Sequence, residues 1–366
     1  MTNKTKNIVV TCVMATFFLG LSVFCWLKPA DDFSNSERRK LAQFPSFSFN
    51  TIMSGDFMEN FESYTLDQFP LRDSLRTLKA KVSLNIFKQS ANNDIYVKNG
   101  YASKMEYPLN EQSVDRAADR FKYVYDKYLK DANTKEYFTV IPDKNYFLAE
   151  ENGYLSIDYS EMITELRENT DFLQYIDITE KLTLEDFYKT DTHWKQENLI
   201  DVAEKIATQM GTDIKTEYEL KTLDKDFYGV YYGQSALPLE AEKIKYFTNN
   251  TLENCKVYDY QNSKEIAVYD MEKAYGKDPY EMFLSGSLSL ITIENEKAKT
   301  NKELVIFRDS FGSSIAPLFV EGYKKVTLVD IRYIHPDMLE KYIEFNNQDV
   351  LFMYSTSVLN NSETIK

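Results

Sequence analysis

Histidine and cysteine are scarce in this chain of 366 residues. Only two histidines occur, His193 and His335, which argues against a transition-metal site built from several imidazoles. Of the three cysteines, Cys12 and Cys25 lie in an apolar N-terminal stretch, so that Cys255 stands alone in the rest of the chain. A single cysteine cannot form an internal disulfide, and we therefore expect none beyond the N-terminal stretch.

Positive charge is also in short supply. Lys and Arg number 43 against 57 Asp and Glu, which gives a net charge of −14, and no run of basic residues is long enough to form a patch. Such a chain as a whole repels nucleic acid and anionic lipid, so nucleic-acid binding is not expected. Hydrophobic residues, by contrast, make up 43% of the sequence. That is ample for one large domain with additions or for two smaller domains.

The longest apolar run lies near the N-terminus. Ile8 to Leu27 contains no charge and follows Lys4 and Lys6, and its length is about that needed to cross a bilayer as a helix. The run ends in the bulky residues 24–27 rather than in small ones. An uncleaved anchor is therefore favoured, with a cleaved signal peptide as the alternative. The two lysines predict a cytoplasmic N-terminus, so the chain beyond residue 30 is expected outside the cytoplasm.

Hydrophobic periodicity divides the remaining chain into an extension and a main domain. Residues 31–105 are expected to form a polar linker, two helices (57–66 and 72–87) and a hairpin at 94–104. The main domain is expected over residues 106–366, with helices at 113–131, 161–167 and 199–210. A tyrosine-rich stretch at about 218–270 lacks helical periodicity and is interpreted as a β-containing insertion.

Short, solidly apolar runs predict strands that are buried on both faces. They occupy residues 137–141, 304–307, 326–329 and 350–353, with a further candidate at 172–178, and helical segments separate the last three. Such alternation of strand and helix predicts right-handed crossovers and a mainly parallel sheet covered by helices. Ligands of such sheets bind beyond the carboxyl ends of the strands. Polar residues at these ends are therefore the first candidates for chemistry.

The first polar cluster follows the predicted strand at 304–307. It runs from Arg308 through Ser310 to Ser314 and leads into a helix. A serine on this turn lies near free backbone N–H groups, which can hold a developing oxyanion at the positive end of the helix dipole. The alternative is that the serines only cap the helix.

The second cluster lies at residues 189–194, just before the helix at 199–210. A serine nucleophile needs a base, usually histidine, and the histidine needs a carboxylate to fix its tautomer. Asp191 and His193 are two residues apart, so both can face one pocket. The alternative is that His193 packs against Trp194 while Asp191 caps the helix. His335, before Pro336, is a second candidate for the base.

The block Asp191-Thr192-His193-Trp194 resembles the signature of the DHHW family, whose second position is more often histidine. The resemblance covers nearly the whole chain after the anchor. The other matching segments are residues 37–45, 67–72, 228–233, 283–287, 309–311 and 330–333.

The DHHW family is similar to alginate acetylation proteins and to SGNH hydrolases in which Asp and His precede the serine. The resemblance implies an SGNH hydrolase-like α/β/α domain with a mainly parallel sheet. It also implies a triad of Ser310, His193 and Asp191. The chemistry implied is acyl-ester chemistry on a cell-surface glycan, commonly beside a multi-spanning membrane O-acyltransferase, and it needs no metal or organic cofactor.

Five further residues are candidates of lower rank. The amide of Phe311 and, through the resemblance, that of Gly286 are candidate oxyanion donors. Lys144 and Arg332 follow strand ends where an acyl donor or sugar could be held, and Tyr232 could stack on a sugar ring. The alternatives are surface charges beside turns for the two basic residues, and packing inside the insertion for the tyrosine.

Taken together, the sequence predicts a single-pass protein of the cell membrane whose folded part lies outside the cytoplasm. We expect it to transfer or hydrolyse an O-acyl group, such as acetyl, on a cell-surface polysaccharide. Whether a sugar hydroxyl or water accepts the acyl group separates a transferase from an esterase, and the sequence leaves this open. The rival hypothesis is a non-catalytic glycan-binding or assembly partner of a membrane O-acyltransferase.

Overall fold

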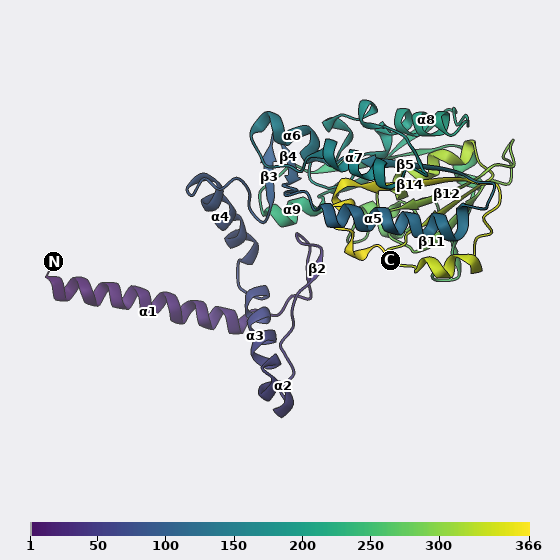
Figure 1. Cartoon of the computed structure of the whole chain (residues 1–366). Coiled ribbons are helices and arrows are strands. Elements are labelled where there is room, and N and C mark those ends of the chain that lie inside the picture. Colours follow the sequence, from purple (N-terminus) through teal and green to yellow (C-terminus); the bar gives the residue numbers. More distant parts are fainter. Residues whose placement is uncertain (1) are drawn as a thin grey trace. The chain divides into compact units, whose positions relative to one another are not determined.

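The computed structural model describes residues 2–366, which divide into two compact units (Figure 1). The first unit consists of Met1–Asn92 and Tyr232–Pro238, and the second of Asn93–Tyr231 and Leu239–Lys366. A short segment in the middle of the sequence thus belongs with the N-terminal part of the chain.

The first unit begins with a long apolar helix, α1 (Asn3–Leu27). Its most apolar window has a mean hydropathy of 2.4, so by length and composition it could cross a membrane, either as an anchor or as a signal sequence. The twenty uncharged residues found in the sequence form most of this helix. The uncharged side chains leave it without a polar face, as a membrane span requires.

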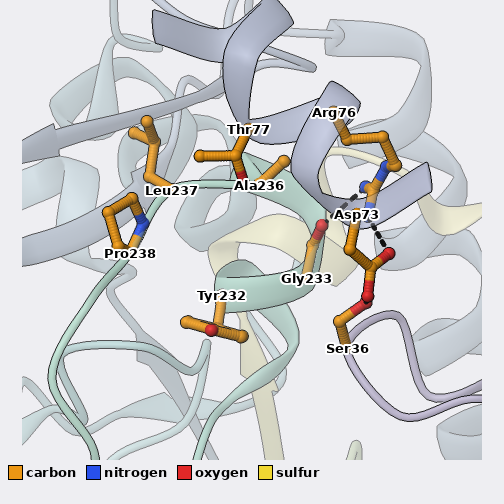
Figure 2. Close-up of a pocket in the computed structure, with 9 residues that line it drawn as sticks. All are labelled: Ser36, Asp73, Arg76, Thr77, Tyr232, Gly233, Ala236, Leu237 and Pro238. Carbon is orange, nitrogen blue, oxygen red and sulfur yellow. Dashed lines mark hydrogen bonds and ion pairs between the residues drawn. The ribbon is translucent and has the colours of Figure 1, made fainter. Parts of the chain in front are cut away.

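The rest of the first unit is a short hairpin followed by three helices. Strands β1 (Phe33–Ser34) and β2 (Arg39–Lys40) precede α2 (Phe49–Ser54), α3 (Asp56–Asp67) and α4 (Arg72–Asn85). Ser48 and Thr51 form a capping box that starts α2, and Gly55, at a φ of +87°, ends it. Residues 232–238 lie against α4, where the Arg76 Nη2 donates to the carbonyl oxygen of Gly233 at 2.7 Å (Figure 2).

The second unit is organised around an eight-stranded sheet. Its spatial order is β10-β9-β11-β13-β12-β14-β5-β6, and the five strands from β13 to β6 run parallel. Strands β10, β9 and β11 pair antiparallel at the other edge. The bounds are β5 (Lys135–Ile141), β6 (Gln174–Tyr175), β9 (Lys256–Asp259), β10 (Lys264–Ile266), β11 (Leu290–Glu294), β12 (Glu303–Arg308), β13 (Lys325–Val329) and β14 (Asp349–Ser355).

Helices cover both faces of this sheet and make three layers (Figure 1). One hydrophobic core packs α8 (Ile200–Gln209) and the segment after α12 (Gly312–Ile315) against one face. A second core packs α5 (Glu111–Val124) and α7 (Tyr159–Asn169) against the other. Successive residues of β12 alternate between the two cores, which is why its sequence is apolar throughout. The α/β/α architecture and mainly parallel sheet predicted from the sequence are confirmed.

Several helices and strands differ in detail from those predicted by the hydrophobic periodicity of the sequence. The helix predicted at 113–131 ends as a π-helix at Tyr125–Leu129, and the segment after Pro336 is a 3-10 helix. Strand β11 was not predicted. The stretch 218–270 holds the hairpin β7 (Glu219–Phe227) and β8 (Glu242–Thr248), and it also supplies β9 and β10 to the main sheet. The remaining elements are the hairpin β3 (Ile95–Lys98) and β4 (Tyr101–Lys104), α6 (Lys144–Asn152), α9 (Val230–Ser235), α10 (Asn250–Asn254), α11 (Met271–Ala274), α13 (Thr356–Leu359) and short 3-10 turns.

Candidate active site

The turn that carries Ser310 is fixed at the carboxyl end of β12 by a buried aspartate. Asp309 Oδ1 accepts the backbone N–H of Phe311 at 3.0 Å. Its other carboxylate oxygen accepts the N–H of Ser355, at the end of the neighbouring strand β14, at 2.7 Å. Because one side chain holds the turn to the adjacent strand, Ser310 projects from a rigid position at the edge of the sheet.

A second segment, residues 187–194, brings the other two predicted residues to the same edge. Phe187 and Trp194 pair in an isolated β-bridge, so the loop between them closes like a small hairpin. The Trp194 Nε1 donates to the Phe311 carbonyl at 3.2 Å and to the Ser314 Oγ at 2.9 Å. This fully buried indole therefore fastens the loop to the helix that begins after Ser310.

The side chains of Asp191, His193 and Ser310 form a continuous chain of hydrogen-bonding groups. The His193 Nε2 lies 2.8 Å from the Ser310 Oγ, and its Nδ1 lies 2.6 Å from the Asp191 Oδ1. The Asp191 side chain is 2% exposed and that of His193 is 14% exposed, while Ser310 is partly exposed. The arrangement has the geometry of a nucleophile, a base and an orienting carboxylate, with the nucleophile open to solvent.

Gly229 allows the backbone of residues 228–233 to pack directly against Asp191. A Cβ atom at this position would lie 2.3 Å from the Asp191 Cα, so only glycine fits without displacement. The close approach lets the Val230 N–H donate to the Asp191 Oδ2 at 2.8 Å, and the Gly229 N–H donate to the Thr190 Oγ1 at 2.9 Å. The carboxylate is therefore held on both of its oxygens. Sequence reasoning had matched this segment to a family without finding its role.

Tyr280 is a neighbour of the site that sequence reasoning missed. Its ring stacks on the imidazole of His193, with centroids 4.0 Å apart and planes inclined by 11°. Its hydroxyl donates to the Ser314 Oγ at 2.8 Å, the same oxygen that accepts from Trp194. Burial raises the pKa of Tyr280 well above its usual value, so the phenol remains a neutral donor. The only signal in the sequence was its place in a tyrosine-rich chain.

The two predicted oxyanion donors are already engaged. The Phe311 N–H donates to Asp309, as described above, and the Gly286 N–H donates to the Phe283 carbonyl at 3.0 Å. Gly286 has a φ of +88°, and its carbonyl oxygen accepts from Arg308. These bonds close the local turns and leave neither amide aimed at a ligand. Both residues stay predictions, with their amides already donating within the local turns, and the N–H of Ser310 is a further candidate on the same turn.

Lys144 lies beneath the loop rather than on the surface. The side chain is buried at the start of α6, and its Nζ donates to the carbonyl oxygens of Tyr188 at 2.8 Å and Lys189 at 3.3 Å. The ammonium also lies over the Tyr231 ring, 4.9 Å from its centroid. Burial lowers the pKa of Lys144 to about 7. The expected contact with a substrate is thus replaced by contacts that support the segment leading to Asp191.

None of the other predicted residues makes a recorded hydrogen bond to Asp191, His193 or Ser310 within residues 2–366. Arg332 makes a bidentate pair with the buried Asp330, at 2.9 and 2.7 Å, and although burial opposes it, this pair raises the pKa of Arg332 above its usual range. Tyr232 belongs to the first unit, where it lines a pocket beside α4 (Figure 2). His335 is exposed and caps a 3-10 helix, so His193 is the histidine that meets the serine. Among residues 2–366 no group of three His, Cys, Asp or Glu could hold a metal ion.

Fold and side chains together define an α/β/α unit with a mainly parallel sheet that carries a Ser-His-Asp constellation at the carboxyl edge of that sheet. No family model matches the chain, and no curated protein does. Solved structures do match.

A DHHW family protein from Eubacterium siraeum DSM 15702 is 21% identical, with a TM-score of 0.60 over 75% of this chain and 95% of that one. Bacillus cereus PatB1 is 18% identical, with a TM-score of 0.59 over 74% of this chain and 98% of that one. A structure of PatB1 with a sulfonyl adduct gives 18% identity and a TM-score of 0.60 over 72% and 95%. At these identities the likeness shows a shared fold, and the relation expected from the residues around Asp191 is confirmed at that level.

Proposed function

We propose that this protein is a serine-dependent enzyme that moves or removes an O-acyl group, such as acetyl, on a cell-surface polysaccharide. The observation that carries the proposal is the pair of contacts at His193, 2.8 Å to the Ser310 hydroxyl and 2.6 Å to the Asp191 carboxylate. A serine that only capped a helix would have no need of an oriented imidazole at its hydroxyl.

In the proposed reaction the Ser310 Oγ attacks the carbonyl carbon of the acyl ester while the His193 Nε2 takes the hydroxyl proton. Asp191 stabilises the imidazolium that forms and holds its tautomer. The Ser310 N–H donates to the oxyanion of the tetrahedral intermediate. When the intermediate collapses, His193 gives the proton to the departing oxygen and an acyl-serine remains. A sugar hydroxyl or water, deprotonated by His193, then attacks the acyl-serine and frees the Ser310 hydroxyl.

The proposed location and partners follow from the N-terminal helix and from the family resemblance. We propose that α1 remains in place as an anchor, since its apolar run lacks small residues at its end. The second unit then works outside the cytoplasm on a polysaccharide at the cell surface. A multi-spanning membrane O-acyltransferase is the proposed source of the acyl group.

A sulfonyl fluoride tests the nucleophile directly, because PatB1 has been solved with a sulfonyl adduct. The detergent-solubilised full chain is treated with the reagent, the modified residue is located by mass spectrometry, and hydrolysis of a chromogenic acetyl ester is measured in parallel. We expect labelling of Ser310 and loss of both labelling and turnover in Ser310→Ala. The loss of turnover should be on the order of 10⁴-fold or more, as for removal of a triad member.

Two variants complete the test. His193→Ala should leave the Ser310 hydroxyl in place but unactivated, so labelling should slow greatly. Ser313→Ala is the matched control on the same short helix, because its hydroxyl only donates to the Gly286 carbonyl at 3.3 Å. If the wild-type chain is neither labelled nor active on the ester, the non-catalytic partner becomes the better explanation.

A further inference from the structure

The first unit exposes an unusual number of large apolar side chains. Within the described ranges Phe49–Ser54 and Asp56–Asp67, which are α2 and α3, no side chain is buried. Phe47 and Phe49 are 76% and 77% exposed. We call the exposed large apolar side chains of residues 44–58 the apolar collar; they are Phe44, Phe47, Phe49, Ile52, Met53 and Met58. So many large apolar side chains exposed close together in sequence point to a binding surface rather than to a face left in water.

The collar is an ordered cluster rather than a loose segment. The Phe44 ring makes edge contacts with those of Phe61 and Tyr64, at centroid distances of 5.9 and 5.4 Å. Phe47 makes a similar contact with Phe57 at 5.5 Å. These contacts align the rings along α3 without enclosing them. The segment is therefore folded to present aromatic surface.

The collar lies next to the last turn of α1. Cys25 and Trp26 of that helix line one small pocket together with Phe61 and Tyr64 of α3. Beyond the end of α1, the Asp31 N–H donates to the Gln68 Oε1, and the Gln68 Nε2 donates to the Asp31 carbonyl oxygen, each at 2.8 Å. Thus α3 is tied to the point where α1 ends, and Trp26 and Tyr64 sit together there. Trp and Tyr are enriched where a membrane-spanning helix meets the membrane–water interface, because one end of each side chain is apolar and the other is polar.

The net charges of the two units indicate which of them can contact an anionic membrane surface. Beyond α1 the first unit has nine Lys and Arg against eight Asp and Glu, which gives +1. With Lys4 and Lys6, on the other side of the span, the whole first unit carries +3, so the total of −14 leaves −17 on the second unit. An anionic lipid surface therefore repels the second unit but not the first. The charge of the first unit therefore allows the collar to contact a bilayer, whereas the charge of the second unit opposes such a contact.

We propose that the apolar collar inserts into the interfacial zone of the lipid bilayer, beside the exit of α1. The occupant of the collar is thus lipid, and α2 and α3 lie at the membrane surface as interfacial helices do. This inference rests on the proposal that α1 is retained as an anchor, and it assigns a second, separate membrane contact to the chain.

Tryptophan quenching by brominated lipid in nanodiscs tests the inference on the full chain. Every variant carries Trp26→Phe, so that the buried Trp194 is the only native tryptophan. Phe49→Trp adds a reporter at an exposed collar position, and Tyr275→Trp, at a position in the second unit that is 56% exposed, is the control. Emission from Phe49→Trp should be quenched by bromine near the carbonyl end of the acyl chain and should shift to shorter wavelength. The control should match the Trp26→Phe background.

A chain that retains Trp26 separates the two possible failures. If Trp26 is quenched by brominated lipid while Phe49→Trp is not, the anchor stands and the collar inference is overturned, whether another protein or a second copy covers the surface. If Trp26 itself is not quenched, the anchor proposal fails first. Quenching of Phe49→Trp and Met53→Trp, with an unquenched control, supports the inference.

Discussion

The buried lysine beneath the candidate site should make stability depend on pH in a specific direction. Burial lowers the pKa of Lys144 to about 7 from its ordinary value of 10.5, while the nearby charges of Asp191 and Glu242 oppose the shift and that of Lys195 adds to it. Above the folded-state pKa the native chain binds fewer protons here than the unfolded chain does. The free energy of unfolding therefore rises with pH across this window.

The size of the effect follows from the difference between the two pKa values. A shift from 10.5 to about 7 corresponds to about 5 kcal/mol over the full window, at about 1.4 kcal/mol for each pKa unit. Between about pH 6 and about pH 9 the linkage relation gives a gain of about 2–3 kcal/mol for the wild-type side chain. The Lys144→Met side chain does not titrate, so the unfolding free energy of this variant should lack the rise with pH that Lys144 contributes.

The assay is urea denaturation followed by the fluorescence of Trp194 in a Trp26→Phe background. Trp194 is buried beside the site, so its emission reports unfolding of the second unit. The quantity measured is the difference in unfolding free energy between the chain with Lys144 and the Lys144→Met chain, at each pH. Titrating groups that do not interact with Lys144 contribute equally to both chains and cancel in this difference.

Lys144→Arg is the matched control, because a guanidinium stays protonated over this range and gives no gain. We expect the difference between Lys144 and Met to grow by about 2–3 kcal/mol toward alkaline pH, and that between Arg and Met to stay constant. A difference that is flat with pH for Lys144 would refute the reasoning, since it would mean that the ammonium keeps an ordinary pKa in the folded chain.

Three further predictions concern the groups that hold the site. Gly229→Ala should push a methyl group into the Asp191 backbone, 2.3 Å away, and should lower ester turnover by up to about 10⁴-fold as His193 loses its orienting carboxylate; normal turnover would contradict this. Tyr280→Phe should retain the ring on His193 and cost about 1 kcal/mol of stability through the lost bond to Ser314, whereas Tyr280→Leu should also lower turnover, with ester hydrolysis and urea melts as the two readouts. Asp309→Asn should cost about 1–3 kcal/mol, because the amide side chain cannot accept from both backbone N–H groups; an unchanged urea midpoint would count against that role.

Local patterns were enough to predict the scaffold and to name the residues of the candidate site. The runs at residues 304–307, 326–329 and 350–353 are apolar at every position because both faces of these strands are covered, and each lies in a parallel strand. Residue types made Ser310, His193 and Asp191 candidates, since a hydroxyl nucleophile needs a base and the base needs a carboxylate, and the family resemblance then joined the three into one predicted triad. The apolar helix α1 could be recognised from its length and lack of charge.

The sequence by itself thus determined the elements of this protein and the kinds of groups that could react. Only the tertiary structure decided which groups meet, because His193 and Ser310 are 117 residues apart and no local pattern encodes their distance. Folding also turned Lys144 inward, engaged the amides of Phe311 and Gly286, and placed Tyr280 on the imidazole. Each of these outcomes depends on packing between distant segments, which sets burial and hydrogen-bond partners independently of the residues beside them in sequence.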